Sequence, residues 1–326
     1  MVTNKKKIMA PATMARAGWD ILNARDDVEA LPYDPLMPTP KFHEELRDVE
    51  GIALALTPFG PAEVAVAPRL KVVARIGVGY DTVEVPALTA HRIPLMIAGT
   101  ANSPTVAEHA MFMMFALAKR SVAQDAVVRE GRWQDRWIDL PVDLLEKTVL
   151  ICGFGRIGIR VAKRLLALEM RVLVYDPYVA AETIKAGGYE PVTDLDGAVA
   201  QADFITVHCP RNPETINLFD AARLARMKPT AFIVNTARGG IINEAALHDV
   251  LAAKKIAGAG IDVFEHEPLG AEHPFYKLTN IILAPHVAGV TKESIDRMAV
   301  ATARNVLSVL DGQPTKENAV NREVFD

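Results

Sequence analysis

The chain of 326 residues is long enough for two domains of ordinary size, and half of its residues are hydrophobic. Its 36 basic and 40 acidic side chains give a net charge of −4, and no basic block interleaves with aromatic residues, so the composition speaks against nucleic-acid binding. The longest apolar run, residues 110–118, has about half of the length that a helix needs to cross a bilayer, so we expect no membrane association.

The two cysteines, Cys152 and Cys209, lie far apart in apolar contexts and match neither a metal-ligand spacing nor a redox pair. We expect both to be buried, reduced thiols. The cationic cluster at residues 5–7 precedes an apolar stretch that is too short for a signal peptide. We therefore expect a cytoplasmic protein without a metal site.

The first hundred residues alternate short apolar runs with helical patterns, which is the rhythm of a parallel βαβ sheet. Strands are expected at residues 6–9, 53–56, 72–76 and 95–97. Helices are expected between them, at residues 12–23, 43–49 and 62–67. This alternation predicts an α/β domain in the N-terminal part of the chain.

A change of pattern follows residue 102. A helix is expected over residues 106–118, with Ser103 as its cap and Pro104 in its first turn. This helix is apolar nearly all round, which predicts burial on all sides, and we place it between two domains. Residues 121–147 then break the alternation and carry Trp133 and Trp137 among charged residues. Such an irregular stretch needs a surface to pack against, so it is either a loop folded on its own domain or an arm that grips a second subunit.

From residue 148 the alternation returns with longer units. Strands are expected at residues 148–152, 171–175, 204–208, 231–235, 259–263 and 281–284. Helices between them include residues 157–168 and 244–253, and Thr291 opens a last long helix over residues 292–310. Six strands with crossover helices make a complete doubly wound sheet.

The first strand of this second series runs into a glycine-rich loop, Gly153-x-Gly155-x-x-Gly158, and a helix follows. The first glycine permits a tight turn, the second lets the backbone approach a pyrophosphate, and the third lets the helix pack on the strand. Asp176 ends the next strand, where its carboxylate would accept hydrogen bonds from the ribose hydroxyls and repel a 2′-phosphate. Because no arginine follows Asp176, we predict NAD rather than NADP.

Three further polar residues follow strands of the same sheet: Arg238, Glu267 and His286. A planar guanidinium such as that of Arg238 can bind the carboxylate of a 2-oxo acid and polarise its ketone. His286 can give a proton to the ketone oxygen, and a Glu267 carboxylate beside the imidazole would favour the protonated form. Each of these residues, taken alone, has a structural role more often than a catalytic one. Because all three follow strands of one sheet, we predict that together they form a catalytic set for hydride and proton transfer.

Several motifs in order resemble the D-isomer-specific 2-hydroxyacid dehydrogenase family over nearly the whole chain. They are the glycine-rich loop, residues 77–81 (GVGYD), 235–240 (NTARGG), 260–264 (GIDVF) with Glu267-Pro268, and 284–289 (APHVAG). The resemblance implies an α/β fold with two doubly wound parallel-sheet domains. A Rossmann NAD domain would span residues 103–290, including the arm at 121–147. A flavodoxin-like substrate domain would combine residues 1–102 and 291–326.

The same resemblance implies further contacts with NAD and with a small 2-oxo or 2-hydroxy acid. Those at the pyrophosphate and nicotinamide come from Arg156, Ile157, Thr236 and Ala237. Asp262 would face the carboxamide, and Ala288 and Gly289 would close the pocket. His208 and Pro210 are expected to line the cofactor pocket, and backbone N–H groups of Val78 and Gly79 would bind the substrate carboxylate.

The sequence leaves the substrate and one rival function open. The loop at residues 57–60 carries no cation, which favours glyoxylate, hydroxypyruvate or pyruvate over a phosphorylated acid, and we expect no regulatory domain beyond Asp326. Glu267 speaks against a formate dehydrogenase, in which a glutamine is expected. The alternatives are a phosphoglycerate dehydrogenase-like enzyme and an NAD-sensing, non-catalytic corepressor-like protein. We expect a homodimer.

Overall fold

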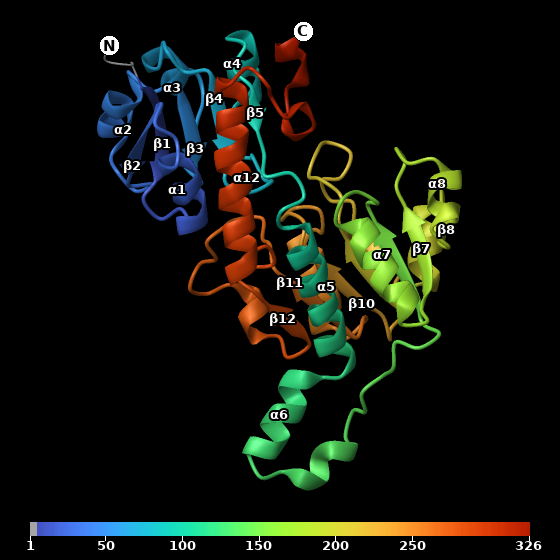
Figure 1. Cartoon of the computed structure of the whole chain (residues 1–326). Coiled ribbons are helices and arrows are strands. Elements are labelled where there is room, and N and C mark those ends of the chain that lie inside the picture. Colours follow the sequence, from blue (N-terminus) through green and yellow to red (C-terminus); the bar gives the residue numbers. More distant parts are fainter. Residues whose placement is uncertain (1–4) are drawn as a thin grey trace. The chain divides into compact units, whose positions relative to one another are not determined.

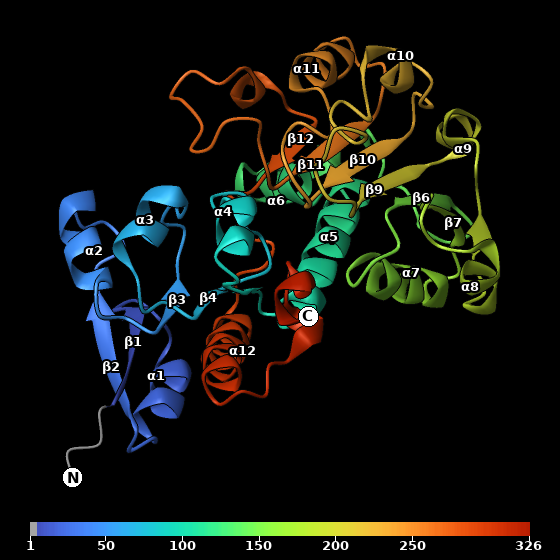
Figure 2. The same ribbon diagram turned by 90° about the horizontal axis from the view of Figure 1, so that it is seen from above.

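The computed structural model describes residues 5–326, and the chain divides into two compact units. Unit 1 combines the residues up to Asn102 with Val290–Asp326, and unit 2 comprises Ser103–Gly289. Each unit has its own sheet (Figures 1 and 2).

Unit 1 is built on a parallel sheet in the order β2-β1-β3-β4-β5, which is the flavodoxin-like order. The strands are β1 (Lys6–Pro11), β2 (Val28–Tyr33), β3 (Gly51–Leu54), β4 (Val72–Arg75) and β5 (Leu95–Met96). Helices α1 (Arg16–Asn23) and α12 (Lys292–Leu310) share one apolar core with the sheet. Helices α2 (Thr39–Leu46), α3 (Pro61–Val66) and α4 (Val85–Ala90) share the other, and two short 3-10 turns, η3 (Lys316–Asn318) and η4 (Arg322–Phe325), end the chain.

The expected elements of unit 1 are present, with shifted ends, and two more were missed. Strand β2 escaped detection because it lies at the edge of the sheet and is only partly buried. It therefore has no continuous apolar run. Helix α4 has six residues, too few for a helical period to stand out. The expected cap of the last helix is confirmed, since the Thr291 hydroxyl accepts the backbone N–H of Ser294 at 3.2 Å.

Unit 2 is built on a larger parallel sheet in the order β12-β11-β10-β9-β6-β7-β8. Its strands are β6 (Thr148–Cys152), β7 (Arg171–Tyr175), β8 (Glu190–Pro191), β9 (Phe204–Val207), β10 (Phe232–Asn235), β11 (Gly258–Ile261) and β12 (Ile281–Leu283). Counted from β6, this is the Rossmann order with one strand added, so the predicted class of two doubly wound parallel-sheet domains is confirmed. The prediction of six strands was wrong by one, because the two-residue strand β8 carries no periodic pattern.

Helices cover both faces of the unit 2 sheet (Figure 2). One face carries α5 (Ser103–Ala118), α7 (Gly158–Ala167) and α8 (Ala181–Ala186). The other carries α9 (Leu195–Gln201), α10 (Ala221–Leu224) and α11 (Glu244–Ala252). Two 3-10 turns, η1 (Trp133–Trp137) and η2 (Pro274–Lys277), complete the unit.

Three expectations for unit 2 were wrong. Helix α5 begins at Ser103 itself, so Ser103 is its first residue and not its cap. It is also not buried all round, because Phe112 is 56% exposed and Phe115 is at 36%. The segment 121–147 is not irregular throughout: it contains helix α6 (Ser121–Arg129) and η1, which project beyond the rest of unit 2 (Figure 1). The exposure of Phe112 and Phe115 shows that part of the apolar surface of α5 is left uncovered.

Candidate active site

The glycine-rich loop follows β6, and each of its three glycines lies in a different environment. Gly153 has a φ of +99°, and a Cβ there would lie 2.5 Å from the backbone nitrogen of Cys209. A Cβ on Gly158 would lie 2.0 Å from the Gly153 carbonyl oxygen. Gly155 differs, because nothing lies within 4 Å of its Cβ position. The chain itself requires Gly153 and Gly158, while Gly155 leaves open space beside the start of α7, where a pyrophosphate would fit.

Asp176 follows β7, and its carboxylate is oriented by the backbone. One oxygen accepts the N–H of Phe154 at 2.8 Å and the other accepts the N–H of Tyr178 at 2.9 Å. An ionised carboxylate has about four acceptor positions, so it retains capacity for two ribose hydroxyls. This arrangement fits the adenosine end of a dinucleotide.

Two buried polar atoms lie just after the neighbouring strands β9 and β10. Nδ1 of His208 and Oγ1 of Thr236 have no hydrogen-bond partner among the described residues, and buried polar atoms in that state are uncommon. The other nitrogen of His208 lies 2.9 Å from the Thr206 hydroxyl. Burial lowers the pKa of His208 to about 3, so the ring is neutral and its Nδ1 is available to a ligand.

The other residues that we expect to contact the cofactor lie near the carboxyl ends of the same sheet's strands. The Pro210 carbonyl accepts the Thr215 hydroxyl at 2.6 Å, and the Ala237 N–H donates to the Asn235 side chain at 3.0 Å. Arg156 is exposed and Ile157 is half-buried at the start of α7. All of them lie on loops at the carboxyl edge of the sheet, the edge where open α/β sheets bind ligands.

Glu267 and His286 are in direct contact. Nδ1 of His286 lies 2.7 Å from Oε2 of Glu267, and Oε1 of Glu267 accepts the backbone N–H of Phe264 at 2.8 Å. The side chain of His286 is 47% exposed and that of Glu267 is 34% exposed. With Nδ1 engaged by the carboxylate, Nε2 is the nitrogen that can serve a substrate. The expected pairing of acid and imidazole is thus present in the geometry.

Asp262 holds the turn on which His286 lies. Its fully buried carboxylate accepts the N–H groups of Val287 at 2.8 Å and Ala288 at 2.9 Å, and its backbone oxygen accepts the N–H of His286 at 2.8 Å. His286 has a φ of +54°, a conformation that costs a non-glycine residue roughly 1–2 kcal/mol. These three bonds offset that cost, so Asp262 is an organiser of the histidine turn, whatever it contacts in a cofactor.

His109 of α5 is a candidate that the sequence interpretation missed. Its buried Nε2 lacks a hydrogen-bond partner within residues 5–326 and lies 3.9 Å from Oδ1 of Asp262. The signal was an imidazole beside Glu108 at the start of the long apolar run of α5. It could be interpreted only once α5 was placed beside β11.

Arg238 lies on the loop that follows β10 and is half-buried. Its Nη1 donates to the Ala237 carbonyl at 2.7 Å, and its own carbonyl accepts Nδ2 of Asn235 at 2.8 Å. A Cβ on the adjacent Gly239 would lie 1.8 Å from the Phe264 carbonyl oxygen. The backbone of the Arg238 loop therefore rests directly on the turn that leads to Glu267.

Val78 and Gly79 lie in unit 1, on the loop that follows β4, and both are half-buried. Beneath this loop is a buried arginine, Arg75, whose Nη1 donates to the carbonyls of Ile76 at 2.6 Å and Leu54 at 3.3 Å. The sequence interpretation found no cation in the 57–60 loop and overlooked this one, because Arg75 belongs to an apolar strand.

Residues 5–326 contain no group of three or more His, Cys, Asp or Glu side chains that could hold a metal ion. Within the same residues, no helix combines the length and apolar character that crossing a membrane requires.

The fold and the site define the class of protein. Residues 111–288 match the family model described as D-isomer specific 2-hydroxyacid dehydrogenase, NAD binding domain. The match spans more than half of the chain, so the chain belongs to this family, and the predicted NAD cofactor is confirmed.

Among curated relatives, a glyoxylate reductase of Korarchaeum cryptofilum is 38% identical over 285 residues, which cover 86% of this chain and 85% of the relative. A D-3-phosphoglycerate dehydrogenase of Archaeoglobus fulgidus is 39% identical over 258 residues, covering 79% of this chain and 48% of the relative. The chain thus spans about half the length of several curated relatives that it matches. A solved D-lactate dehydrogenase from Aquifex aeolicus, complexed with NAD and lactic acid, has a TM-score of 0.84 at 27% identity and covers 97% of this chain and 99% of its own.

Proposed function

We propose that the chain is an NAD-dependent dehydrogenase that reduces a small 2-oxo acid to the D-2-hydroxy acid and catalyses the reverse reaction. The contact of His286 with Glu267 at 2.7 Å carries this proposal, because it supplies an oriented general acid. Family membership and relatives named glyoxylate reductase, D-lactate dehydrogenase and phosphoglycerate dehydrogenase support the reaction class. Unit 2 would be the dinucleotide-binding domain and unit 1 the substrate domain.

Each proposed catalytic residue has one task. Bound NADH supplies the hydride. Arg238 binds the substrate carboxylate and polarises the ketone, through charge-assisted hydrogen bonds worth about 1.5–3 kcal/mol each. Nε2 of His286 gives its proton to the ketone oxygen, a step that contributes about 10²–10⁴-fold in rate. Glu267 holds the ring through Nδ1, and Val78 and Gly79 offer backbone N–H groups to the carboxylate.

The nucleotide end is proposed to use the remaining residues. The loop from Gly153 to Gly158, with Gly155, Arg156 and Ile157, would hold the pyrophosphate, and Asp176 the ribose. His208, Pro210, Thr236, Ala237, Asp262, Ala288 and Gly289 would line the nicotinamide side. Nδ1 of His208 and Oγ1 of Thr236, which are buried and have no hydrogen-bond partner within residues 5–326, support this placement.

The test is consumption of NADH, followed by absorbance, with glyoxylate, hydroxypyruvate, pyruvate and 3-phosphohydroxypyruvate. We expect turnover with an unphosphorylated acid and a loss of at least 100-fold in kcat for His286→Asn, in line with the usual value of a general acid. His248→Asn on α11 is the control. Preference for the phosphorylated acid would favour the phosphoglycerate dehydrogenase-like alternative. No consumption of NADH with any of the acids, together with NADH binding, would favour the corepressor-like alternative.

We also propose a homodimer formed through the arm at residues 121–147. Trp133 and Trp137 are 60% and 68% exposed, with the Arg136 guanidinium 5.4 and 5.1 Å from their ring centres. Apolar side chains this exposed need a partner surface, and Phe112 of α5 adds to them. Light scattering should return a dimer mass, which a double Trp133→Ser, Trp137→Ser variant loses. A monomer mass for the unaltered chain would refute the assembly.

A cytoplasmic location is proposed on the state of the cysteines. Cys152 is buried, Cys209 is half-buried, and both are free thiols. Burial raises the pKa of the Cys209 thiol to about 11, so it is protonated and unreactive at neutral pH. Unreactive, unpaired thiols suit a reducing compartment.

A further inference from the structure

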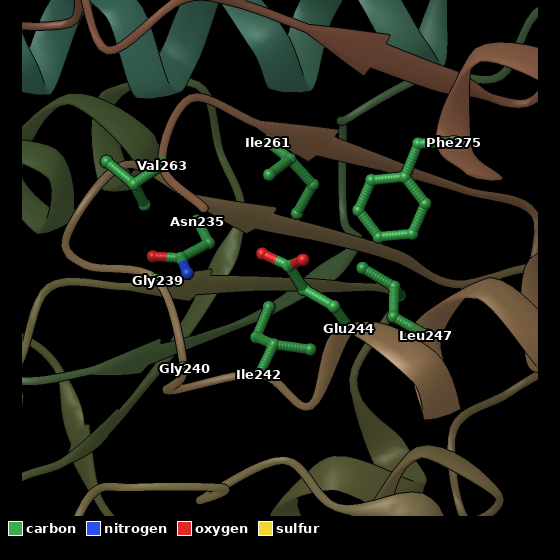
Figure 3. A pocket seen from close by; sticks show the side chains of 9 residues that line it. All are labelled: Asn235, Gly239, Gly240, Ile242, Glu244, Leu247, Ile261, Val263 and Phe275. Carbon is green, nitrogen blue, oxygen red and sulfur yellow. The ribbon is translucent and has the colours of Figure 1, made fainter. Parts of the chain in front are cut away.

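Glu244, the first residue of α11, places its carboxylate against a small cavity that Gly239 and Gly240, next to Arg238, help to line. The cavity measures about 10 Å³, room for about one water molecule. Figure 3 shows the carboxylate pointing inward. The residues around it are Asn235, Gly239, Gly240, Ile242, Leu247, Ile261, Val263 and Phe275. The side chain of Glu244 is only 17% exposed, and a carboxylate so placed is costly unless its oxygens are bonded.

Both oxygens of Glu244 have partners, and the partners come from other segments. Oε1 accepts the backbone N–H of Glu265 at 2.5 Å, and the Glu265 side chain accepts the backbone N–H of Glu244 at 3.1 Å. Oε2 lies 3.4 Å from Nε2 of His273. The start of α11 and the turn at Glu265 are therefore tied together in both directions.

The His273 ring is oriented to meet Glu244. Its Nδ1 accepts the backbone N–H of Phe275 at 3.4 Å, which leaves the ring proton on Nε2, the nitrogen that faces the carboxylate. The ring also packs edge-on against Phe264 and Phe275, with ring centres 6.1 and 4.9 Å apart. His273 thus contacts Phe264, which is next to Glu265, the residue whose N–H binds Glu244.

The segment that contains Phe264 and Glu265 also carries Glu267. Phe264, which precedes Glu265, donates its N–H to Glu267 at 2.8 Å, and Glu267 in turn meets His286 at 2.7 Å. The backbone at Gly239 also lies close to the Phe264 carbonyl oxygen, which would be 1.8 Å from a Cβ at Gly239. The Phe264–Glu267 turn is therefore in contact with both the Arg238 loop and the Glu244 carboxylate.

We propose that Glu244, with His273, is a positioning residue: it fixes the turn that carries Glu267, and so sets the contact of Glu267 with His286. The inference rests on the proposed function for its kinetic consequence, but its structural claim concerns only the placement of one side chain. A shift of about 1 Å at a catalytic group can cost about 100-fold in rate, so the effect falls on kcat. Substrate affinity, which depends on other residues, changes little.

The test compares Glu244→Ala, Glu244→Gln and the control Asp249→Asn. Asp249 lies on the same helix, is 83% exposed and pairs with His248 at 3.3 Å. We expect Glu244→Ala to lower kcat by about 10- to 100-fold, with KM changed less than about threefold, and to alter the pH profile of reduction. Glu244→Gln, which keeps an oxygen for the Glu265 N–H, should recover most of kcat, and Asp249→Asn should match the unaltered chain.

A second readout needs no turnover. In protein labelled with ¹⁵N-histidine, the Nδ1 proton of His286 should give a low-field resonance that His286→Asn assigns by its loss. We expect Glu244→Ala to shift or broaden this signal and Asp249→Asn to leave it in place. If Glu244→Ala fails to fold, Glu244→Asp keeps the charge, lacks the reach to Glu265 and should show the same change.

An unmoved resonance, with kcat and pH profile unchanged in a folded Glu244 variant, would overturn the positioning role. The failure of the unaltered chain to reduce any 2-oxo acid is a different result. It would refute the proposed activity, while the resonance would still decide whether Glu244 places Glu267 against His286.

Discussion

Replacement of Asp262 by asparagine tests how the proposed catalytic histidine is held. The carboxylate is fully buried and accepts two backbone N–H groups, from Val287 at 2.8 Å and Ala288 at 2.9 Å. Asparagine has nearly the same shape but only one acceptor oxygen. One of the two N–H groups would then face an amide NH₂ group, and the other would lose the charge of its partner.

The size of the effect follows from these two bonds. A buried donor left without a partner costs about 1–3 kcal/mol, and a neutral acceptor in place of an ionised one costs about 1 kcal/mol more. The variant Asp262→Asn should therefore lose about 2–4 kcal/mol of unfolding free energy. In a unit of this size, each kcal/mol lowers Tm by about 2–4 °C, so we expect a decrease of roughly 5–15 °C.

Calorimetry measures the stability, and NADH consumption measures the catalytic consequence. Because the strained φ of His286 depends on the same turn, kcat should fall together with Tm. Asp249→Asn, an exposed change on α11, is the matched control. A variant Asp262→Asn whose Tm lies within about 2 °C of the unaltered chain, with normal kcat, would show that the two bonds do not hold the histidine turn.

Three shorter predictions follow from other contacts. Glu267→Gln should move the high-pH limb of reduction to lower pH, because a neutral partner favours the protonated His286 less; an unmoved limb in a stopped-flow pH series would contradict the pairing. His208 is neutral in the fold, with its pKa lowered to about 3. Stability should therefore be full above pH 6.5 and decline as pH falls toward about 3, and thermal melts of His208→Gln should show a smaller decline. Asp176→Asn keeps one oxygen for the Phe154 and Tyr178 N–H groups but loses its charge. Fluorescence titration should therefore show a smaller preference for NADH over NADPH. An unchanged ratio of the two dissociation constants would argue that the charge of Asp176 does not select the cofactor.

The local patterns of unit 2 were predicted best. Strands β6 and β7 begin and end at the expected residues, because each contains four consecutive apolar residues, 149–152 and 172–175. The loop from Gly153 to Gly158 was recognisable because the tight turn and the close packing leave no room for a Cβ. The cap of α11 is an equally local feature, since the Asn243 side chain accepts the N–H of Ala246 at 2.9 Å.

Exposure and long-range pairing were predicted worst. The apolar helix α5 was expected to be buried all round, yet Phe112 is exposed, since composition alone does not say how many neighbours a helix has. Edge strands such as β2 and β8 gave no signal because they bury little side-chain area.

The sequence by itself determined the class of fold and the nucleotide loop, and it predicted the proposed catalytic acid and imidazole, since each of these follows from motifs or strand patterns that are short in the chain. Only the tertiary structure showed the left-handed backbone of His286, His109 near Asp262, and the contact of Glu244 with His273. The last two features join segments that are distant in sequence, and the His286 turn is held by hydrogen bonds to Asp262 on another segment. The energy of a buried polar group depends on which partners the fold brings within hydrogen-bond distance, and that cannot be deduced from spacing along the chain.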